Sequence, residues 1–296
     1  MVTPVARREA VRVAGETYGL SERRRCRLVG TSRATVRYRS RRPSDDTLRD
    51  QLIQFASERR RWGYRRLAIL VRRTGVQVNL KRVRRVYRAA GLHVRRRPKR
   101  LRTVARVPAL PVAPTMTNEW WAMDFLRDAL GEGRVFRVFT LEDLCSREAL
   151  ALTIDHSLPA LRVVRVLEAV AAVRGYPRYL RVDNGPEFIS QALDAWAHAH
   201  GVQLVFIQPG KPVQNAHVES FNGKVRDEFL NEHWFGSIAE AQVLAEMFRR
   251  DFNTVRPHSA LKNLTPEEFV KSLAGSPAGP AHPQDQEPAL TTAGVT

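Results

Sequence analysis

The feature of the sequence that most constrains its fold is the alternation of strand-like and helix-like apolar patterns between residues 118 and 230. Apolar, β-prone runs predict strands at 120–126, 135–144, 149–154, 179–183 and 202–207. Helical spacing of apolar residues predicts helices at 161–174, 190–200 and 216–230. Three strands in succession, followed by strands that alternate with helices, predict a mixed five-stranded sheet covered by helices, which is an α/β fold.

The first third of the chain is strongly basic. Lys and Arg number 49 in the whole chain, against 30 Asp and Glu. Residues 1–106 contain 32 of the basic residues and 7 of the acidic ones, which leaves 17 and 23 for the remainder. A solvated helix face usually mixes both signs, so this one-sided excess favours contact with DNA or RNA.

The sequence carries no sign of a membrane protein or of a disulfide framework. No stretch approaches the ~18 consecutive apolar residues that span a bilayer, and the first residues lack the apolar core of a secretory signal. The two cysteines, Cys26 and Cys145, lie far apart in the sequence and suggest neither a disulfide framework nor a zinc site. We therefore expect a cytoplasmic, nucleoid-associated protein with no membrane partner.

Two blocks within the basic third have helix-turn-helix character. In the first, at residues 20–39, Ser21 can cap a short helix, and Gly30 marks the turn before a second helix. The second helix resembles a recognition helix. Arg33 and Arg37 are its candidate DNA contacts.

The second block predicts three helices, at residues 47–60, 65–73 and 79–90. The last of them has an apolar stripe on one side and basic residues around the rest, with Arg82 and Arg85 as candidate DNA contacts. A small three-helix bundle without a ligand would explain the apolar stripe but would give the arginines no role. DNA binding is therefore the favoured interpretation.

Composition divides the chain into six segments. The prolines near residue 110 favour extended backbone and mark a linker, and the Pro-, Ala- and Gly-rich end predicts disorder. Thr265 as N-cap, Pro266 at the first helical position and Glu268 completing a capping box predict a helix near the end of the ordered chain. The expected segments are a helix-turn-helix segment (1–42), a second helical DNA-binding domain with a basic arm (45–106), a linker (107–117), a catalytic core (118–235), a helical extension (236–272) and a disordered tail (273–296).

Three acidic residues stand out against the apolar pattern. Asp124 interrupts an apolar strand, where an unpaired buried carboxylate would be costly. Asp183 closes another strand just before a turn, and Glu219 lies beside the predicted buried stripe of its helix. Together they could form an oxygen cage for Mg²⁺, although each alone could equally be the partner of an arginine, a turn residue or a surface acid.

The spacing of these acids and the sequences around them resemble a known family. Asp183 and Glu219 are separated by 35 residues, and with Asp124 they are similar to the Asp-Asp-Glu signature of the transposase and retroviral integrase superfamily. The sequences at 182–188, 209–224, 252–261 and 265–268 resemble those of bacterial insertion-sequence transposases encoded by the second of two overlapping reading frames. The resemblance covers residues 45–272.

The resemblance implies a ribonuclease-H-like core, preceded by all-α helix-turn-helix domains, in which Asp124, Asp183 and Glu219 are catalytic and hold two Mg²⁺ ions, or Mn²⁺ in their place. It implies strand cleavage at the ends of a mobile element and strand transfer into target DNA, both by in-line displacement. The implied partners are double-stranded DNA, further copies of the chain in a homo-oligomer on DNA, and the helix-turn-helix protein of the upstream frame.

Several assignments around the acids stay open. Arg226 and Lys224 are candidate phosphate contacts, although Lys224 projects to the far side of the helix that carries Glu219. Unlike retroviral integrases, the chain has no paired His and Cys zinc module near its N-terminus, and it has Gly223 where many integrases have a lysine. His258 could be a DNA contact or a structural residue.

Two other functions compete with an active transposase. The chain could be a DNA-binding protein that descends from a transposase and retains its acids. It could also be a ribonuclease-H-type nuclease that hydrolyses strands but never joins them. The long basic region argues against a simple nuclease, because such an enzyme needs no domain dedicated to recognising element ends.

Overall fold

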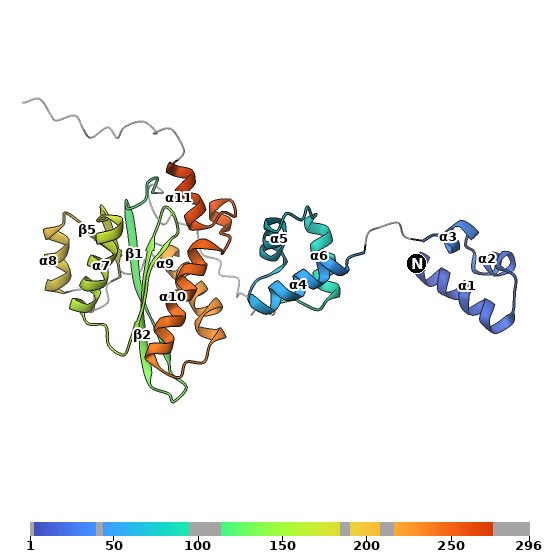
Figure 1. The fold of residues 1–296 in the computed structure, drawn as a ribbon, viewed down its shortest axis with the longest axis horizontal. Helices are drawn as coiled ribbons and strands as arrows, with labels where there is room; N and C mark the ends of the chain where they lie inside the picture. The colour runs from blue at the N-terminus through green and yellow to red at the C-terminus, as the bar shows by residue number, and fades with distance from the viewer. Residues whose placement is uncertain (1–2, 40–43, 95–113, 184–189, 208–215, 275–296) are drawn as a thin grey trace, which may run out of the picture. The chain divides into compact units, whose positions relative to one another are not determined.

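The computed structural model describes residues 3–39, 44–94, 114–183, 190–207 and 216–274 (Figure 1). The chain divides into two compact units, Met1–Ile53 and Gln54–Thr296. The predicted basic arm at 95–100, most of the predicted linker and nearly all of the predicted tail lie outside the described residues. Among the described helices, none is long and apolar enough to cross a membrane.

The first unit opens with a helix that the sequence analysis did not predict. α1 (Pro4–Tyr18) follows Thr3, whose hydroxyl accepts a hydrogen bond from the backbone N–H of Ala6 at 3.2 Å. A threonine cap with proline at the first helical position is a recognised start signal, so the sequence did contain the information.

The first helix-turn-helix block has the predicted elements. α2 (Glu22–Val29) ends at Gly30, which adopts a left-handed conformation with φ of 63°. α3 (Arg33–Arg37) follows Ser32, whose hydroxyl caps it by accepting a hydrogen bond from the backbone N–H of Thr35 at 3.1 Å. Glycine reaches this conformation without steric cost, which explains its place in the turn.

The second block also has its three predicted helices, α4 (Asp46–Glu58), α5 (Tyr64–Arg73) and α6 (Leu80–Ala89). Asn79 caps α6 by accepting a hydrogen bond from the backbone N–H of Lys81 at 2.8 Å. α5 and α6 each bury an apolar stripe, made by Leu67, Ala68, Val71, Val83, Val86 and Tyr87.

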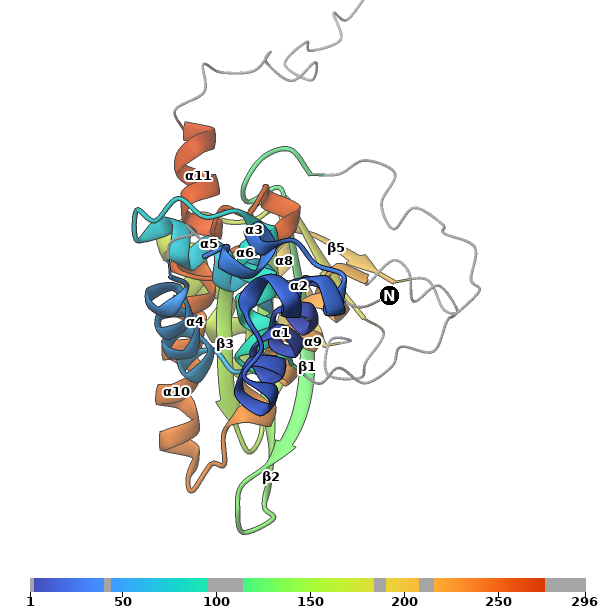
Figure 2. The ribbon, with the colours of Figure 1, turned by 90° about the vertical axis from the view of Figure 1, so that its right-hand side faces the viewer.

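The rest of the second unit is built on the predicted mixed five-stranded sheet. Its strands are β1 (Trp120–Ala129), β2 (Val135–Asp143), β3 (Ala149–Asp155), β4 (Tyr179–Val182) and β5 (Gln203–Phe206), in the order β3-β2-β1-β4-β5. β1, β2 and β3 are antiparallel neighbours, whereas β4 runs parallel to both β1 and β5. Figure 2 shows the long hairpin of β1 and β2.

Helices cover both faces of the sheet, so each face has its own hydrophobic core. α7 (Ala160–Arg174) and α8 (Gln191–Ala199) pack on one face, and α9 (Ala216–Glu228) and α10 (Ile238–Thr254) pack on the other (Figure 1). The predicted stripe of α9 is fully buried; it consists of Val218, Phe221, Val225 and Phe229.

The C-terminal segment contains short 3-10 helices η2 (Leu230–Glu232) and η3 (Ser259–Leu261) and ends in α11 (Pro266–Ala274). The predicted capping box of α11 is confirmed, because Thr265 Oγ1 accepts a hydrogen bond from Glu268 N and Glu268 Oε2 accepts one from Thr265 N. His258 is only 3% exposed and its Nε2 lies 3.2 Å from the carbonyl oxygen of Phe252. His258 is therefore a structural residue and not a DNA contact.

A buried carboxylate, Glu228, joins three parts of the second unit. It accepts two hydrogen bonds from Arg256, both 2.7 Å, one from Arg66 at 2.8 Å and one from the indole of Trp62 at 3.1 Å. Burial would raise the pKa of Glu228, but the hydrogen bonds and charges of the two arginines outweigh it and lower the pKa to about 2.

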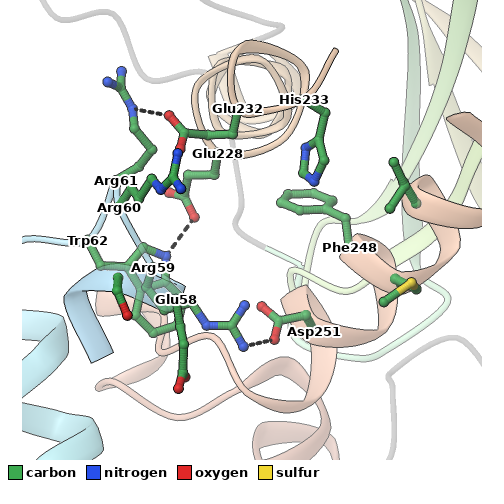
Figure 3. Close-up of a pocket in the computed structure, with 13 residues that line it drawn as sticks. Glu58, Arg59, Arg60, Arg61, Trp62, Glu228, Glu232, His233, Phe248 and Asp251 are labelled. Carbon is green, nitrogen blue, oxygen red and sulfur yellow. Dashed lines mark hydrogen bonds and ion pairs between the residues drawn. The ribbon is translucent and has the colours of Figure 1, made fainter. Parts of the chain in front are cut away.

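Further ion pairs lie near Glu228, and Figure 3 draws that of Arg59 with Asp251. Arg59 pairs with Asp251 and Arg61 with Asp227, and Arg73 donates to Glu268 at 2.7 Å. We call the whole set the ionic clasp; it consists of Arg59, Arg61, Arg66 and Arg73 on one side and Asp227, Glu228, Asp251 and Glu268 on the other. The clasp means that several arginines of the basic region bind acids of the same chain.

Glu228→Gln should lower the free energy of unfolding by about 3 kcal/mol, because breaking a buried pair leaves Arg256, which is 2% exposed, without a counter-charge. Urea denaturation measures the loss. The pKa of Glu228 in the folded protein lies below its ordinary value of 4.5. The stabilisation is therefore fully present above about pH 4.5 and is lost as the pH falls towards 2.

Glu267→Gln is the matched control, since Glu267 forms an exposed pair with Lys271 on α11. Its loss should change the free energy of unfolding by less than about 1 kcal/mol. Equal effects of the two substitutions would contradict the role assigned to Glu228.

Candidate active site

Asp124 lies in the middle of β1, on the face of the sheet that α9 covers. Its neighbours along the strand alternate as expected, since Met123 belongs to the core under α7 and α8 while Ala122 packs against Val218 of α9. The backbone N–H of Phe125 donates to Asp124 Oδ1 at 2.7 Å, and the side-chain amide of Asn222 donates to Oδ2 at 2.7 Å. Both carboxylate oxygens are thus held by hydrogen bonds.

The surroundings of Asp124 raise the pKa of its carboxyl group. Burial raises its pKa to about 6, and the charges of Asp183 and Glu219 add to the increase. The hydrogen bonds from Phe125 and Asn222 lower the pKa, but they do not outweigh the burial. Asp183 and Glu219 therefore both lie within electrostatic reach of Asp124.

Asp183 directly follows β4, and the pairing of β4 with β1 explains its position. The parallel register pairs Trp120 with Tyr179, Trp121 with Leu180 and Ala122 with Arg181. Continued for two more residues, the same register brings Asp183 alongside Asp124. Adjacent strands lie about 4.8 Å apart, so both carboxylates belong to one edge of the α9 face.

Glu219 lies in the first turn of α9 and is exposed. Asn222 lies three residues further along the same helix, so the two side chains lie on the same side of α9. Because Asn222 donates to Asp124, it ties this side of α9 to β1. Asn222 also lies 2.9 Å from the hydroxyl of Thr140 on β2, which makes a second link between the helix and the sheet.

Asn222 was not assigned a role in the sequence analysis. It is 6% exposed, and its amide serves both β1 and β2. The sequence held one sign of this role, because Asn222 follows Glu219 by three residues and so shares its side of the helix. An asparagine in an amphipathic helix cannot be assigned a partner, however, until the strand that faces the helix is known.

The donor set of the three acids fits a divalent cation in its chemistry. The negative charges of Asp183 and Glu219 raise the pKa of Asp124, so a cation would relieve the repulsion. Within the described ranges, no three His, Cys, Asp or Glu side chains are already arranged closely enough to hold a metal ion. The carboxylates would have to draw together around the ion.

β2 ends in two buried acids, Glu142 and Asp143, and Glu142 was not singled out from the sequence. Glu142 is 1% exposed, and burial raises its pKa to about 7, against the opposing charge of Lys224. Burial lowers the pKa of Lys224, whose ammonium also lies 5.7 Å from the ring centroid of Phe252. Lys224 is thus a half-buried counter-charge to Glu142, and its contact with phosphate stays a prediction.

The other predicted DNA contacts occupy three separate elements. Arg33 and Arg37 of α3 both lie 2.9 Å from Glu22. On α6, Arg85 is exposed and Arg82 is half-buried. Arg226 of α9 is exposed, and its guanidinium lies 3.4 Å from the carbonyl oxygen of Arg127. Their contacts with DNA stay predictions.

Asn222→Ala should raise the pKa of Asp124 above about 6, because the substitution removes a hydrogen bond that stabilises the carboxylate. The carbon chemical shift of the carboxyl group, followed by NMR during a pH titration, measures the change. Ser220→Ala is the control on the exposed side of the same helix and should leave the titration unchanged. An unaltered Asp124 titration in the Asn222 variant would refute this role.

Three family models match the chain. An HTH-like domain matches residues 43–100, and two integrase core domain models match residues 114–212 and 200–266. The first model coincides with the second helical block, and the other two cover the sheet and the helices that carry the acids.

Curated proteins of two bacterial insertion elements resemble the chain over most of its length. The uncharacterized 31.7 kDa protein of insertion element IS407 from Burkholderia multivorans is 48% identical over 269 residues, which cover 90% of this chain and 96% of that protein. The uncharacterized 39.2 kDa protein of insertion element IS476 from Xanthomonas euvesicatoria is 43% identical over 283 residues, covering 95% and 82% respectively.

Among solved structures, the fold is similar to a chain in the simian T-cell lymphotropic virus intasome in complex with PP2A regulatory subunit B56 gamma. The TM-score is 0.50 at 15% sequence identity, and the match covers 80% of each chain. The sheet order, the helices on both faces and this likeness show a ribonuclease-H-like integrase core preceded by an all-helical region. With its HTH-like domain, its integrase core and its near full-length identity to insertion-element proteins, the chain belongs to the insertion-sequence transposases of the Asp-Asp-Glu transposase and retroviral integrase superfamily.

Proposed function

We propose that this protein cuts DNA at the ends of a mobile element and joins the freed ends to target DNA. The observation that carries the proposal is the parallel register of β1 and β4, together with the hydrogen bond from Asn222 to Asp124. The register of β1 and β4 brings Asp183 alongside Asp124, and Asn222 ties Asp124 to the helix that carries Glu219. Membership of the transposase family supplies the reaction class.

The integrase core family typically uses a divalent metal ion. Asp124, Asp183 and Glu219 are the residues that would hold two Mg²⁺ ions, or Mn²⁺ in their place, because these cations prefer carboxylate oxygen. When bound, such ions lower the pKa of a water nucleophile and neutralise charge on the reacting phosphate.

The chain's own contribution is to orient the carboxylates. Hydrogen bonds from Phe125 N and from the amide of Asn222 hold the two oxygens of Asp124, so the carboxylate cannot rotate freely. Deprotonation of Asp124 above pH 6 provides the ionised ligand that a cation needs. Glu219, exposed at the start of α9, is accessible to a DNA strand lying over this face.

The two reactions then balance as successive displacements at phosphorus. In cleavage, water forms a bond to phosphorus while the bond to the 3′-oxygen breaks, which leaves a free 3′-hydroxyl. In strand transfer, that hydroxyl forms a bond to a target phosphorus while the target's own bond to a 3′-oxygen breaks. Each joining conserves the number of phosphodiester bonds, so no covalent intermediate with the protein is required.

Recognition of the element ends would belong to the basic helical region. The HTH-like match and the excess of arginine favour double-stranded DNA as the partner of residues 1–106, with Arg33, Arg37, Arg82 and Arg85 as candidate contacts. Arg226 and Lys224 of α9 are further candidate contacts. The working form would be a homo-oligomer that bridges two DNA ends, with the upstream-frame protein as a further candidate partner. Such an assembly would be associated with the nucleoid in the cytoplasm.

Asp183→Asn should abolish Mg²⁺-dependent cleavage and joining while DNA affinity changes less than about twofold, because the substitution removes a metal ligand without removing a positive charge. Both activities can be followed on labelled element-end duplexes, with binding measured in parallel by gel shift. Asp194→Asn, an exposed aspartate in the first turn of α8, is the control and should retain both activities.

The outcome separates the three functions. Cleavage and joining that both depend on Asp183 support a transposase. Cleavage without joining in the wild-type protein would identify a nuclease, and DNA binding without either activity would identify a DNA-binding derivative. Joining by the Asp183 variant at the wild-type rate would overturn the site assignment.

A further inference from the structure

A cavity of about 520 Å³ lies between α5, α6 and the segment that follows Arg256. Arg65 and Arg66 enter it from the start of α5, and Arg84 and Arg88 enter it from α6. Asn263 lines the opposite wall in a left-handed conformation with φ of 68°. The cavity is distinct from the face that carries the three acids, and nothing in the proposed function uses it.

The lining of this cavity is strongly positive. No Asp or Glu is among the described residues that line it. Arg66 is compensated by Glu228 of the ionic clasp, but no ion pair is recorded for Arg65, Arg84 or Arg88 within the described part of the chain. A cavity lined by charges of one sign concentrates ions of the opposite sign, so these three arginines around one cavity indicate a site for an external anion.

Aromatic packing and the backbone strengthen this positive character. The guanidinium carbons of Arg65 and Arg84 lie 5.7 and 6.0 Å from the ring centroid of Tyr64, which limits their motion. Gly63, the N-cap of α5, supplies no side-chain acceptor and lines the cavity, so the positive end of the dipole of this ten-residue helix adjoins it.

The ionic clasp separates the arginines of the helical domain into two groups. Arg59, Arg61, Arg66 and Arg73 are used to hold residues 54–94 against the core. Arg65 lies on α5, as Arg66 and Arg73 do, whereas Arg84 and Arg88 lie on α6, and none of these three arginines belongs to the clasp. A guanidinium binds phosphate oxygens through two parallel N–H donors, which makes a phosphate the best match for this lining.

We propose that this cavity binds a backbone phosphate of DNA, held by Arg65, Arg84 and Arg88 between the HTH-like domain and the segment of Asn263. The inference rests on the proposed function, because it takes DNA as the partner. It adds that DNA is bound where the helical domain meets the core, so that one phosphate lies against residues of both. The site would act on DNA of any sequence, since a phosphate carries no base identity.

The test compares the double variant Arg84→Ala/Arg88→Ala with the matched double variant Arg162→Ala/Arg165→Ala, which removes two exposed arginines from α7. Binding of a fluorescently labelled DNA duplex is measured by anisotropy over a range of salt concentrations. The cavity variant should lose about tenfold in affinity, and the slope of log K against log salt should become shallower by about one per lost contact. The α7 variant should stay within about twofold of wild type.

A lysine pair, Arg84→Lys/Arg88→Lys, keeps the charge and should recover part of the lost affinity and most of the salt slope. Circular dichroism and urea denaturation confirm that each variant folds. If the cavity variant binds DNA as tightly as the wild-type protein does, this inference is overturned and the proposed function is not. Equal losses in the two double variants would also overturn this inference, because the effect would then be one of net charge.

A competition experiment with inorganic phosphate completes the test. If it competes with DNA for the wild-type protein but not for the cavity variant, the site is a phosphate site on the DNA path. If it binds the cavity without affecting DNA affinity, the cavity takes free phosphate and the proposal fails. If the wild-type protein does not bind DNA at all, both this inference and the proposed function fail.

Discussion

The position of α9 is the constraint on which the rest of the structure depends. At its middle, Asn222 hydrogen-bonds to Asp124 on β1, and at its end Glu228 accepts hydrogen bonds from Arg256, Arg66 and Trp62. A fully buried apolar stripe runs along the helix and lies against the sheet. A helix fixed at its middle, at its end and along one side cannot slide or rotate, so Glu219 is presented at one defined place relative to the strands.

Much of this architecture follows from local patterns. Alternating apolar runs predicted all five strands and the helices between them, because each pattern reports its own element and needs no distant partner. The capping box at Thr265 and the turn at Gly30 were equally local. The three acids could be selected because each breaks an apolar pattern or follows one, and because their spacing resembles a family signature. α1 was missed, although Thr3 and Pro4 marked its start.

What the sequence could not reveal depends on contacts between distant segments. Arginines look alike in a basic run, whether they bind an acid of the core, as Arg59 and Arg61 do, or remain available, as Arg84 does. Lys224 and His258 carry polar side chains but are directed inwards by elements far away in the sequence. Glu142 lies opposite Ala122 in a register that only the folded hairpin defines. Such pairings must be seen before a charged residue can be assigned to the surface or to the core.

The ionic clasp has a consequence for how such proteins can diversify. Residues 54–94 and the helices α9 to α11 are joined by the ion pairs of the clasp, so they should open together in hydrogen exchange as one cooperative unit, and not as two independent modules. A chimera would keep the clasp only if its incoming helical domain carried arginines at the positions that match the acids of residues 227–268. New end specificities would therefore arise more readily by exchange of the whole 54–274 block, or by substitution outside the clasp, than by swapping the helical domain alone.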